Sequence, residues 1–507
     1  MSQITVIDTS NINLSGLGDS IFQNRETLSY INNKYYKSDV TIYIQGYNNV
    51  NKVKNCINSV LKYTQGIDYD LILVDNGSVD ETFEYFKSIE FDKKTIIRFT
   101  KNCGPLLPHL YIGNELFSKY AVFLTDDLVV TSNWLSNMLR IAESDPKIGM
   151  VNPMSSNASN YQGVYFDFSN YDEMQEKAAK FNVSNPQKWH ERMRLLTLGT
   201  LYRKECLYTI GHPITDVGFA HNFADDDITF RVRRAGYKAI LAKDTWIHHD
   251  DNKLNSTIEQ AIKINRDLDI GRENFKTKYF GIDAWDDVNN FINEYIGELK
   301  PVASDDGDRI LGIDVRCGTP VLEIKNYLRS FDIFDAECFA FTTAGKYFLD
   351  LQTVCGADNV YCGDINTFPS YFDRSSFDQI VIGEEVNTYI DPFRIIKNAF
   401  ELLKDNGQLF FSVKNTLNMY ALIYAAGGTD IRNPVHAVNY TAEEFLSRLL
   451  QEGYDASFIA AGYMEPRTIS REMTEKVESI LKKLAVKEIN ETMLRLKSER
   501  FYFTIRK

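Results

Sequence analysis

Aspartates in the first half of the sequence have the placement of a ligand site. Asp75 and the pair Asp126-Asp127 each end an apolar run. A run of three aspartates, 225–227, opens a helical stretch. Because ligands of open α/β sheets bind beyond the carboxyl ends of the strands, we expect the first two groups to share one crevice. Adjacent carboxylates repel one another unless a cation neutralises them, and their oxygens suit Mg²⁺ or Mn²⁺ completed by substrate phosphates.

Each of these groups also has an ordinary structural explanation. The turn 75–78, Asp-Asn-Gly-Ser, is favourable in any protein. An aspartate at the start of a helix is a good N-cap. The functional interpretation therefore rests on the joint placement of the groups.

The elements that would position the aspartates are strands alternating with helices. An amphipathic helix is indicated by apolar residues on one face, namely Val53, Ile57, Val60 and Leu61. Strands are predicted at 40–44, 70–74, 95–99 and 120–124, and further helices at 80–89 and 104–117. This alternation indicates βαβ units and a mostly parallel sheet.

A long irregular stretch, 155–194, follows these units and is rich in aromatic and polar residues. Long loops within compact domains are often functional, so we expect substrate contacts here. The segment Lys188-Trp189-His190 is either a stacking face for a sugar or peptide, or a surface loop with one buried anchor.

A second α/β alternation follows a polar, acidic break at 304–308. Its strands are predicted at 310–315, 337–341, 359–362, 379–382 and 408–413, with a helix at 392–403. A charged amphipathic helix at 470–497 and a strand at 501–505 follow. The predicted organisation is an N-terminal extension (1–37), a first domain (38–254), a helical region with a linker (255–308) and a second domain (309–507).

Composition narrows the function classes. The 507 residues are 44% hydrophobic, which is enough for full cores and argues against disorder. The net charge of −13 disfavours nucleic acid and membrane surfaces as main partners. Seven scattered cysteines without a CxxC predict neither a disulfide framework nor a structural zinc site. With no signal peptide and no apolar span recognised, we expect a cytoplasmic protein.

The ordered motifs of the first 250 residues resemble those of the family 2 glycosyltransferases, which have the GT-A nucleotide-sugar fold. The matching segments include an Asp-x-Asp-like element and a late histidine, and they are 44–48, 73–78, 102–104, 123–127, 134–135, 199–203, 210–213, 223–228 with Arg231, and 247–249. The resemblance implies an inverting transfer of a sugar from a nucleotide-sugar donor to a hydroxyl acceptor.

The resemblance also implies roles for individual residues. Asn48 and Asp75 would hold the nucleoside, with Asp75 accepting a hydrogen bond from the imide N–H of the base. The remaining donor-binding candidates are Asn76, Gly104 and Asp126. Asp127 would ligate a divalent metal, Mn²⁺ or Mg²⁺, with His248 as a further ligand. Asp225 would be the general base for the acceptor hydroxyl.

The sequence departs from the family pattern at two elements and leaves alternatives open. Thr125 replaces the first carboxylate of the Asp-x-Asp element, so Asp126 is either the second ligand or a cap. The catalytic element reads Ala-Asp-Asp-Asp, so the base is either Asp225 or Asp226. His248 could instead be a satisfied partner of a backbone group. Arg231 could form an ordinary i, i+4 ion pair with Asp227.

The family's processive members carry a Gln-x-x-Arg-Trp element, which none of the four tryptophans of this chain provides. We therefore expect the addition of a single sugar. The expected donor is a UDP-sugar, with UDP-N-acetylglucosamine as one candidate. The acceptor would be a glycan or a protein Ser/Thr, and flagellin and surface glycans are candidates by analogy.

The segment 310–320 resembles the first motif of class I S-adenosylmethionine methyltransferases, in which a strand runs into a glycine-rich turn under the cofactor. Segments 363–365, 377–382 and 403–407 fit the same family. Arg316 and Pro320 stand where the family has glycines, and the second strand ends at 341–344 without the acidic residue that would hold the ribose. We expect a domain kept for acceptor docking or dimerisation. The alternative functions are a glycan methyltransferase and a non-catalytic binding module.

Overall fold

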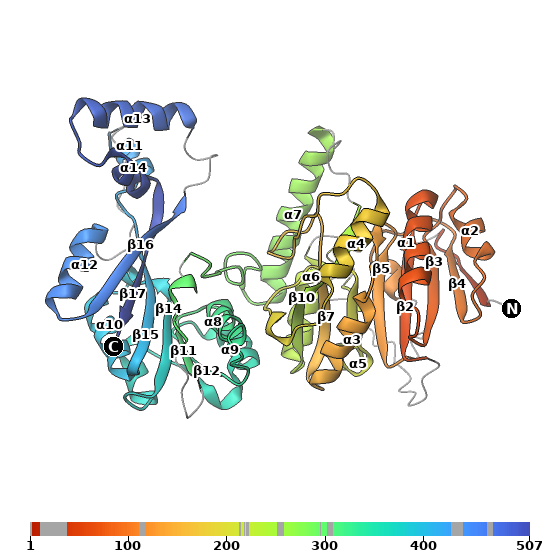
Figure 1. Ribbon diagram of the computed structural model, residues 1–507, viewed down its shortest axis with the longest axis horizontal. Coiled ribbons are helices and arrows are strands. Elements are labelled where there is room, and N and C mark those ends of the chain that lie inside the picture. The colour runs from red at the N-terminus through yellow and green to blue at the C-terminus, as the bar shows by residue number, and fades with distance from the viewer. Residues whose placement is uncertain are drawn as a thin grey trace. The chain divides into compact units, whose positions relative to one another are not determined.

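The computed structural model describes residues 3–10, 38–110, 118–211, 214–216, 219, 223–250, 258–294, 296–301, 308–426, 440–463 and 470–507. It divides into two compact units, Met1–Asn289 and Asn290–Lys507 (Figure 1). The division falls inside the stretch 255–308 that was predicted to be a helical region and linker. Residues 304–307 of that linker and 11–37 of the N-terminal extension lie outside the described residues.

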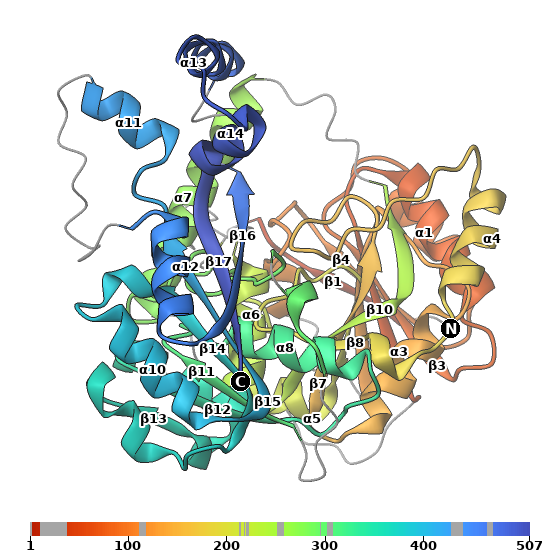
Figure 2. The same cartoon turned by 60° about the vertical axis from the view of Figure 1, so that its left-hand side comes forward.

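The first unit is built on a mixed sheet whose strands, as far as the structure describes them, follow the order β1-β4-β3-β2-β5-β9-β7-β10-β6, with β8 paired to β10 (Figures 1 and 2). Strands β1 to β5 pair in parallel, whereas β9 is antiparallel to both β5 and β7. The strands are β1 (Gln3–Ile7), β2 (Val40–Gly46), β3 (Tyr69–Asp75), β4 (Lys94–Phe99), β5 (Tyr120–Thr125), β6 (Leu128–Val129), β7 (Ile148–Ser155), β8 (Trp189–Glu191), β9 (Thr200–Arg203) and β10 (Lys238–His249).

Helices cover both faces of this sheet because its strands carry apolar side chains on both sides. Ile42 and Ile44 of β2 belong to a core that also contains residues of α1, α2 and α3. The intervening Tyr43 belongs to the opposite core, with residues of α4, α5 and α6. The helices are α1 (Val50–Tyr63), α2 (Thr82–Ser88), α3 (Trp134–Ser144), α4 (Tyr171–Phe181), α5 (Lys204–Ile210), α6 (Ala224–Arg234) and α7 (Ile258–Lys278).

Several elements of the first unit were not predicted from the sequence, and β1 and α4 are two of them. Residues 3–7, within the predicted extension, form β1 at the sheet edge, where the apolar Ile4 and Val6 are exposed. The stretch predicted to be irregular contains α4, which is capped by Asn170 accepting from the Glu173 N–H. The predicted helix 104–117 is described only as far as the 3₁₀ turn η3 (Leu107–Leu110).

The second unit has a sheet in the order β13-β12-β11-β14-β15-β17-β16, in which β17 is antiparallel to both neighbours. This is a doubly wound α/β arrangement with an antiparallel strand inserted near one edge. The strands are β11 (Arg309–Ile313), β12 (Glu337–Thr342), β13 (Val360–Cys362), β14 (Phe377–Glu385), β15 (Leu403–Lys414), β16 (Asp455–Tyr463) and β17 (Ser498–Arg506). The helices are α8 (Thr319–Arg329), α9 (Phe348–Cys355), α10 (Pro392–Leu402), α11 (Met419–Ala426), α12 (Ala442–Gln451), α13 (Arg471–Lys483) and α14 (Ile489–Lys497).

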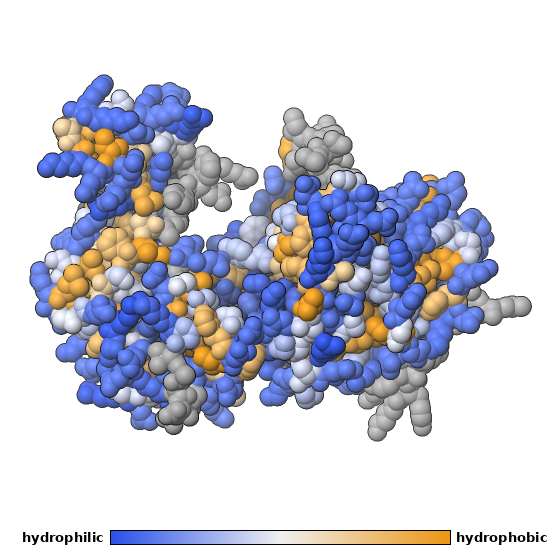
Figure 3. Space-filling view, in the orientation of Figure 1, coloured by the Kyte–Doolittle hydropathy of each residue, from blue (hydrophilic) through white to orange (hydrophobic). Residues whose placement is uncertain are grey.

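The charged tail predicted as one helix forms the two helices α13 and α14 (Figure 2). Ala485 and Glu488 between them have φ values of 54° and 53°, which end the first helix and redirect the chain. Hydrophilic residues predominate on the face seen in Figure 3, as expected of an acidic protein. None of the helices in the described ranges is long and apolar enough to cross a membrane.

Candidate active site

The site lies where the strand order of the first unit reverses. Strand β2 has β3 on one side and β5 on the other, so the carboxyl ends of all three meet at one edge. In the register, Gly46 pairs with Asp75, and Gln45 pairs with Thr125. Because neighbouring strands lie about 4.8 Å apart, the ends of β3 and β5 are separated by about 10 Å. The structure therefore brings together Asp75 and Asp127, which the sequence places 52 residues apart.

Backbone and side-chain hydrogen bonds join the three strand ends. The Tyr47 N–H donates to Asp126 Oδ2 over 3.4 Å, which ties the β2 turn to the β5 turn. Asn48 has a φ of 50°, its N–H donates to Ser78 Oγ over 3.1 Å, and its Oδ1 accepts from the Val79 N–H over 2.8 Å. Asn48 thus holds the β3 turn in place.

Asp75 is a buried carboxylate with one oxygen still able to accept a hydrogen bond. Its Oδ1 accepts from the Ser78 N–H over 3.0 Å, whereas Oδ2 accepts no hydrogen bond from the described residues. Oδ2 is ion-paired with Arg98, whose Nε lies 3.3 Å away. Burial raises the pKa of Asp75 despite the opposing effects of Ser78 and Arg98. A buried acceptor without a hydrogen-bond donor is costly, so a donor from outside the described residues would stabilise this oxygen.

Asn76 and Gly77 pack the next loop against the end of β3. Asn76 Nδ2 donates to Gly104 O over 2.9 Å, and its Oδ1 accepts from the Cys103 N–H over 3.1 Å. Gly77 has a φ of 81°, and a Cβ there would lie 2.4 Å from the carbonyl carbon of Lys101. Only glycine allows this approach. The side chain of Asn76 is therefore occupied in positioning Gly104 and its loop.

The β5 turn shifts the pKa values of its two carboxyl groups, Asp126 and Asp127, in opposite directions. Burial and the charge of Asp127 raise the pKa of Asp126 to about 6. Burial also raises the pKa of Asp127, but hydrogen bonds from His249 and Thr125 outweigh it and hold this pKa below its ordinary value. Thr125 donates its hydroxyl to Asp127 Oδ1 over 2.5 Å. The residue that departs from Asp-x-Asp thus orients the carboxylate that remains.

The structure places His249, and not the predicted His248, beside Asp127. The His249 Nε2 lies 3.3 Å from Asp127 Oδ2. The His248 Nδ1 is hydrogen bonded to Ser156 Oγ over 2.8 Å, and its ring packs edge-on against Phe168. Adjacent residues of a strand point to opposite faces, so only one of the two histidines can face the turn.

The donor set at this turn fits a divalent cation that substrate oxygens complete. Among the described residues no group of three His, Cys, Asp or Glu side chains is arranged to hold a metal alone. The Asp127 carboxylate and the His249 imidazole nevertheless converge, and Mg²⁺ and Mn²⁺ are commonly bound by one or two protein ligands plus phosphates. The buried His249 Nδ1 has no hydrogen-bond partner in the described structure.

The three aspartates of α6 differ in whether a cationic side chain is paired with them. Asp225 is half-buried and accepts a hydrogen bond from the Thr197 hydroxyl. Asp226 is buried and ion-paired with Arg194, and burial raises its pKa to about 6 despite that partner. A hydroxyl acceptor can therefore reach Asp225 more readily than Asp226.

Asp227 belongs to a buried network that fixes the helix. It pairs with Arg231 Nε over 2.9 Å, as the i, i+4 spacing predicts, and also with Lys278 of α7. The Tyr279 hydroxyl donates to Asp227 Oδ1 over 2.7 Å. Burial raises the pKa of Asp227, but Arg231 and Lys278 outweigh it and lower the pKa overall. Asp227 anchors α6 and leaves Asp225 at its exposed end.

The segment 197–199 connects α6 with the β5 turn. Thr197 contacts Asp225, and a Cβ on Gly199 would lie 2.6 Å from Ile247 Cδ1 and 3.4 Å from Leu124 Cδ2. Ile247 and Leu124 immediately precede the histidine pair and the Thr125–Asp127 turn. Thr197 therefore links Asp225 to a segment that packs beside the β5 turn and the histidine pair.

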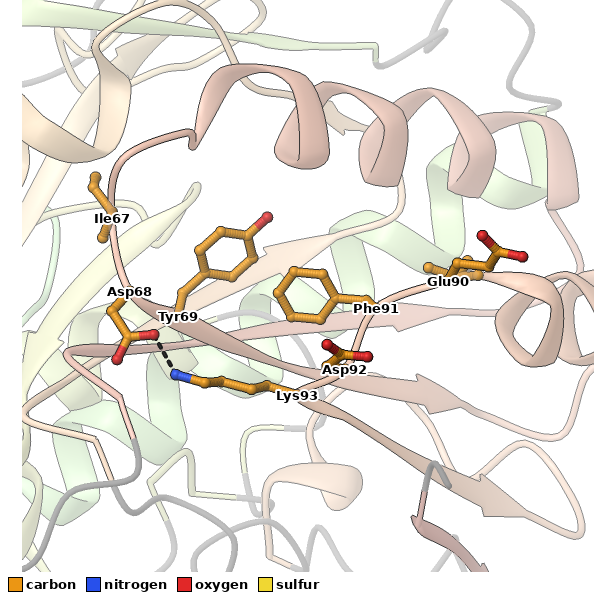
Figure 4. A pocket seen from close by; sticks show the side chains of 8 residues that line it. Ile67, Asp68, Tyr69, Glu90, Phe91, Asp92 and Lys93 are labelled. Atoms are coloured by element: carbon orange, nitrogen blue, oxygen red, sulfur yellow. Dashed lines mark hydrogen bonds and ion pairs between the residues drawn. The ribbon is translucent and has the colours of Figure 1, made fainter.

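Other predicted contact residues lie elsewhere. Trp189 is buried, and its Nε1 donates to Asp244 Oδ2 over 2.7 Å, so this tryptophan is the buried anchor of its loop. His212 and Pro213 of the predicted acceptor-side segment lie outside the described residues. A surface pocket at the amino ends of β3 and β4 is remote from the carboxylates, and its lining includes an ion pair between Asp68 and Lys93 (Figure 4).

Residues 41–202 match the model of the family described as Glycosyl transferase family 2. The first unit contains a family 2 glycosyltransferase domain. The matched residues include Asn48, Asp75 and Asp127, whereas Asp225 and His249 lie beyond them. The assignment of the last two to the glycosyltransferase site therefore depends on the geometry described above.

Curated sequences and solved structures include proteins similar to parts of this chain. Uncharacterized protein y4gI from Sinorhizobium fredii (strain NBRC 101917 / NGR234) is 22% identical over 260 residues, which cover 48% of this chain and 28% of that protein. The mannosyltransferase PcManGT from Pyrobaculum calidifontis, solved with GDP-Man and Mn²⁺, is 15% identical with a TM-score of 0.35, covering 52% of this chain and 70% of that chain. A SAM dependent methyltransferase from Archaeoglobus fulgidus is 18% identical with a TM-score of 0.30, covering 46% of this chain and 99% of that chain.

The fold class predicted from the sequence is confirmed. Both units are α/β, with the strand orders given above, and residues 41–202 of the first unit match the glycosyltransferase family. The family of the first unit supports nucleotide-sugar glycosyl transfer as its chemistry.

Proposed function

We propose that the first unit is a metal-dependent, inverting glycosyltransferase that moves one sugar from a uridine diphosphate donor to a hydroxyl. The proposal is supported by three acids with different surroundings: Asp75 and Asp127 follow the two strands that flank β2, and Thr197 links Asp225 to the segment beside the β5 turn. Asp75 has a buried oxygen without a donor, Asp127 is paired with a histidine, and Asp225 is the least neutralised carboxylate of α6. These are the groups that base recognition, diphosphate departure and proton removal require.

Asp75 supports uridine as the nucleoside of the donor. Because Oδ1 is already bonded to the Ser78 N–H, only Oδ2 is left for the base. Uracil presents a single imide N–H between two carbonyls, so Oδ2 would accept that N–H while Arg98 could donate to a neighbouring carbonyl. Guanine presents two adjacent N–H groups, for which one free oxygen is a poorer match.

Asp127 and His249 would hold the Mn²⁺ or Mg²⁺, and when bound the cation supplies charge that stabilises the leaving diphosphate. Asp126 would contribute mainly by accepting from the Tyr47 N–H, which fixes the β2 turn. Thr125 would keep the Asp127 carboxylate oriented.

Asp225 would take the proton from the acceptor hydroxyl. As the acceptor oxygen forms its bond to the anomeric carbon, the bond from that carbon to the diphosphate oxygen breaks on the opposite face, and the proton passes to the carboxylate. The Thr197 hydroxyl would orient Asp225 for this step. The acceptor we propose is a glycan or a protein Ser/Thr, with flagellin and surface glycans as candidates to assay.

The proposal is tested by hydrolysis of a panel of UDP- and GDP-sugars, UDP-N-acetylglucosamine included, by the full chain with and without Mn²⁺. We expect UDP-sugar hydrolysis that requires the cation and falls at least about 100-fold in Asp127→Asn. Asp225→Asn should lose a similar factor, because general bases contribute about 10²–10⁴. Asp92→Asn, an exposed carboxylate at the opposite sheet edge, is the matched control and should retain activity.

Two results would contradict the proposal. Hydrolysis that is unchanged in EDTA or in Asp127→Asn would remove the cation from the mechanism. A preference for GDP-sugars would overturn the assignment of Asp75 as the acceptor for a uracil imide.

A further inference from the structure

The second unit has its own point of strand-order reversal, where a ligand of this fold would bind. Strand β11 lies between β12 and β14, and the carboxyl ends of β11 and β14 border the crevice. In open α/β sheets ligands bind at this position. The methyltransferase resemblance would place S-adenosylmethionine there.

An ion pair bridges this crevice. Arg316 is in the turn between β11 and α8, and Glu384 is at the end of β14. The Arg316 Nε lies 2.7 Å from Glu384 Oε1, and its Nη2 lies 3.3 Å from Oε2. Two-point pairing of this kind orients both side chains. The arginine therefore joins the two strand ends between which a cofactor would enter.

The backbone of the turn does not offer the open cradle that the glycine-rich motif provides. Arg316 has a φ of 52°, a conformation in which glycine is unstrained and arginine is not. Pro320, in the first turn of α8, contributes no N–H to a ligand. A Cβ on Gly383 would lie 2.6 Å from both Asp314 O and Val315 Cα, so the ends of β11 and β14 are in close contact.

The residue at the position that would hold the ribose forms hydrogen bonds within the protein instead. Thr343 follows β12 and donates both its N–H, over 2.6 Å, and its hydroxyl, over 2.9 Å, to Asp314 Oδ1. The Tyr389 hydroxyl donates to Asp314 Oδ2 over 2.8 Å. Asp314 thus accepts internal hydrogen bonds at both oxygens, and the Thr343 hydroxyl is bonded to Asp314 at the position where the family has a carboxylate for the cofactor.

We propose that the second unit does not bind S-adenosylmethionine and that the Arg316–Glu384 pair stabilises its β11–β14 junction in place of a ligand. The residues present do not fit the cofactor, and methyl transfer is not a second activity of the chain. The proposal is independent of the glycosyltransferase site, because none of its residues belongs to the first unit.

The decisive experiment is calorimetric titration of the wild-type full chain with S-adenosylmethionine and, separately, S-adenosylhomocysteine, each to 20-fold molar excess over about 50 µM protein. We expect no saturable heat with either. A saturable isotherm with about one site per chain would overturn the proposal. Since the wild-type chain is used, the result does not depend on whether a variant folds.

A second experiment tests the ion pair. Thermal unfolding of Arg316→Gln, Glu384→Gln and the double variant is followed by circular dichroism. Each single variant should lower Tm, and the double variant should lower it by less than the sum of the two. The exposed pair Arg374–Glu401 is the control, and its variants should be nearly neutral. Strict additivity at Arg316 and Glu384 would refute their joint role.

Discussion

The close approach at Gly77 gives a prediction that separates steric contact from backbone conformation. Gly66 and Gly77 have nearly the same φ, 84° and 81°. A Cβ at position 66 would meet nothing within 4 Å, whereas at position 77 it would lie 2.4 Å from the Lys101 carbonyl carbon and 2.5 Å from the Asn102 nitrogen. Gly66→Ala and Gly77→Ala therefore have the same conformational cost, and only Gly77→Ala adds a steric clash.

The expected magnitudes follow from this difference. A left-handed conformation costs an alanine about 1–2 kcal/mol, so Gly66→Ala should destabilise by about that amount. Overpacking adds about 1–3 kcal/mol in Gly77→Ala, because both contacts are with backbone that cannot rotate away. For a urea slope of about 3 kcal/mol per M, the midpoint of Gly77→Ala should lie about 0.3–1 M below that of Gly66→Ala.

Tryptophan fluorescence is a selective assay for this comparison. The tryptophans of the chain are at positions 134, 189, 246 and 285, all within the first unit. Urea unfolding followed by this signal therefore reports the unit that contains both glycines. Gly77→Ala should also weaken UDP binding several-fold more than Gly66→Ala, since the clash displaces the turn that holds Asp75. Equal midpoints in the two variants would refute the argument from close approach.

Three further predictions concern the β5 turn. His249→Ala should raise the Mn²⁺ concentration for half-maximal hydrolysis at least about tenfold. His248→Ala should lower the fluorescence midpoint in urea and leave the Mn²⁺ requirement near that of the wild type. The reverse pattern would assign the cation to His248. Thr125→Val removes a hydrogen bond that lowers the pKa of Asp127, so the acidic limb of the pH–hydrolysis profile should move to higher pH. Thr125→Ser retains the hydroxyl and should leave this limb in place. An unmoved limb in the valine variant would contradict the role of the hydroxyl. The folded-state pKa of Asp126 is raised to about 6, so its ionisation lowers the stability of the folded state as the pH rises from about 4 to 6. Asp126→Asn should flatten that part of the stability–pH curve, measured by fluorescence. An unchanged slope would refute the raised pKa of Asp126.

The parts of the fold that could be predicted are those with strong local signals. Strands β2, β3 and β5 are buried apolar runs ended by polar turn residues, and their parallel pairing follows from the helices between them. Once the sheet is parallel, Asp75 and Asp127 must come to one edge. Their meeting could therefore be predicted without knowing any side-chain contact.

The parts that could not be predicted depend on contacts distant in sequence. Strand β1 is stabilised by pairing with β4 rather than by its own pattern. The separation of α13 from α14 occurs at Ala485 and Glu488, without the glycine or proline that usually marks a helix end. Asp225 and Asp226 could not be distinguished because their difference comes from Arg194 and Thr197, which lie outside α6.

The irregular pairing of β10 has a consequence for comparing this protein with others. Ala242 pairs with Pro153 and Trp246 with Met154, so residues 243–245 are looped out opposite a single step of β7. A strand with one residue fewer at this point would reverse the side on which every later side chain emerges. In such a relative, the residue aligned with His249 would face away from the proposed cation site. The histidine on the cation side would then align with His248. Histidines that match by motif should therefore be assigned only after the residues of this loop have been counted.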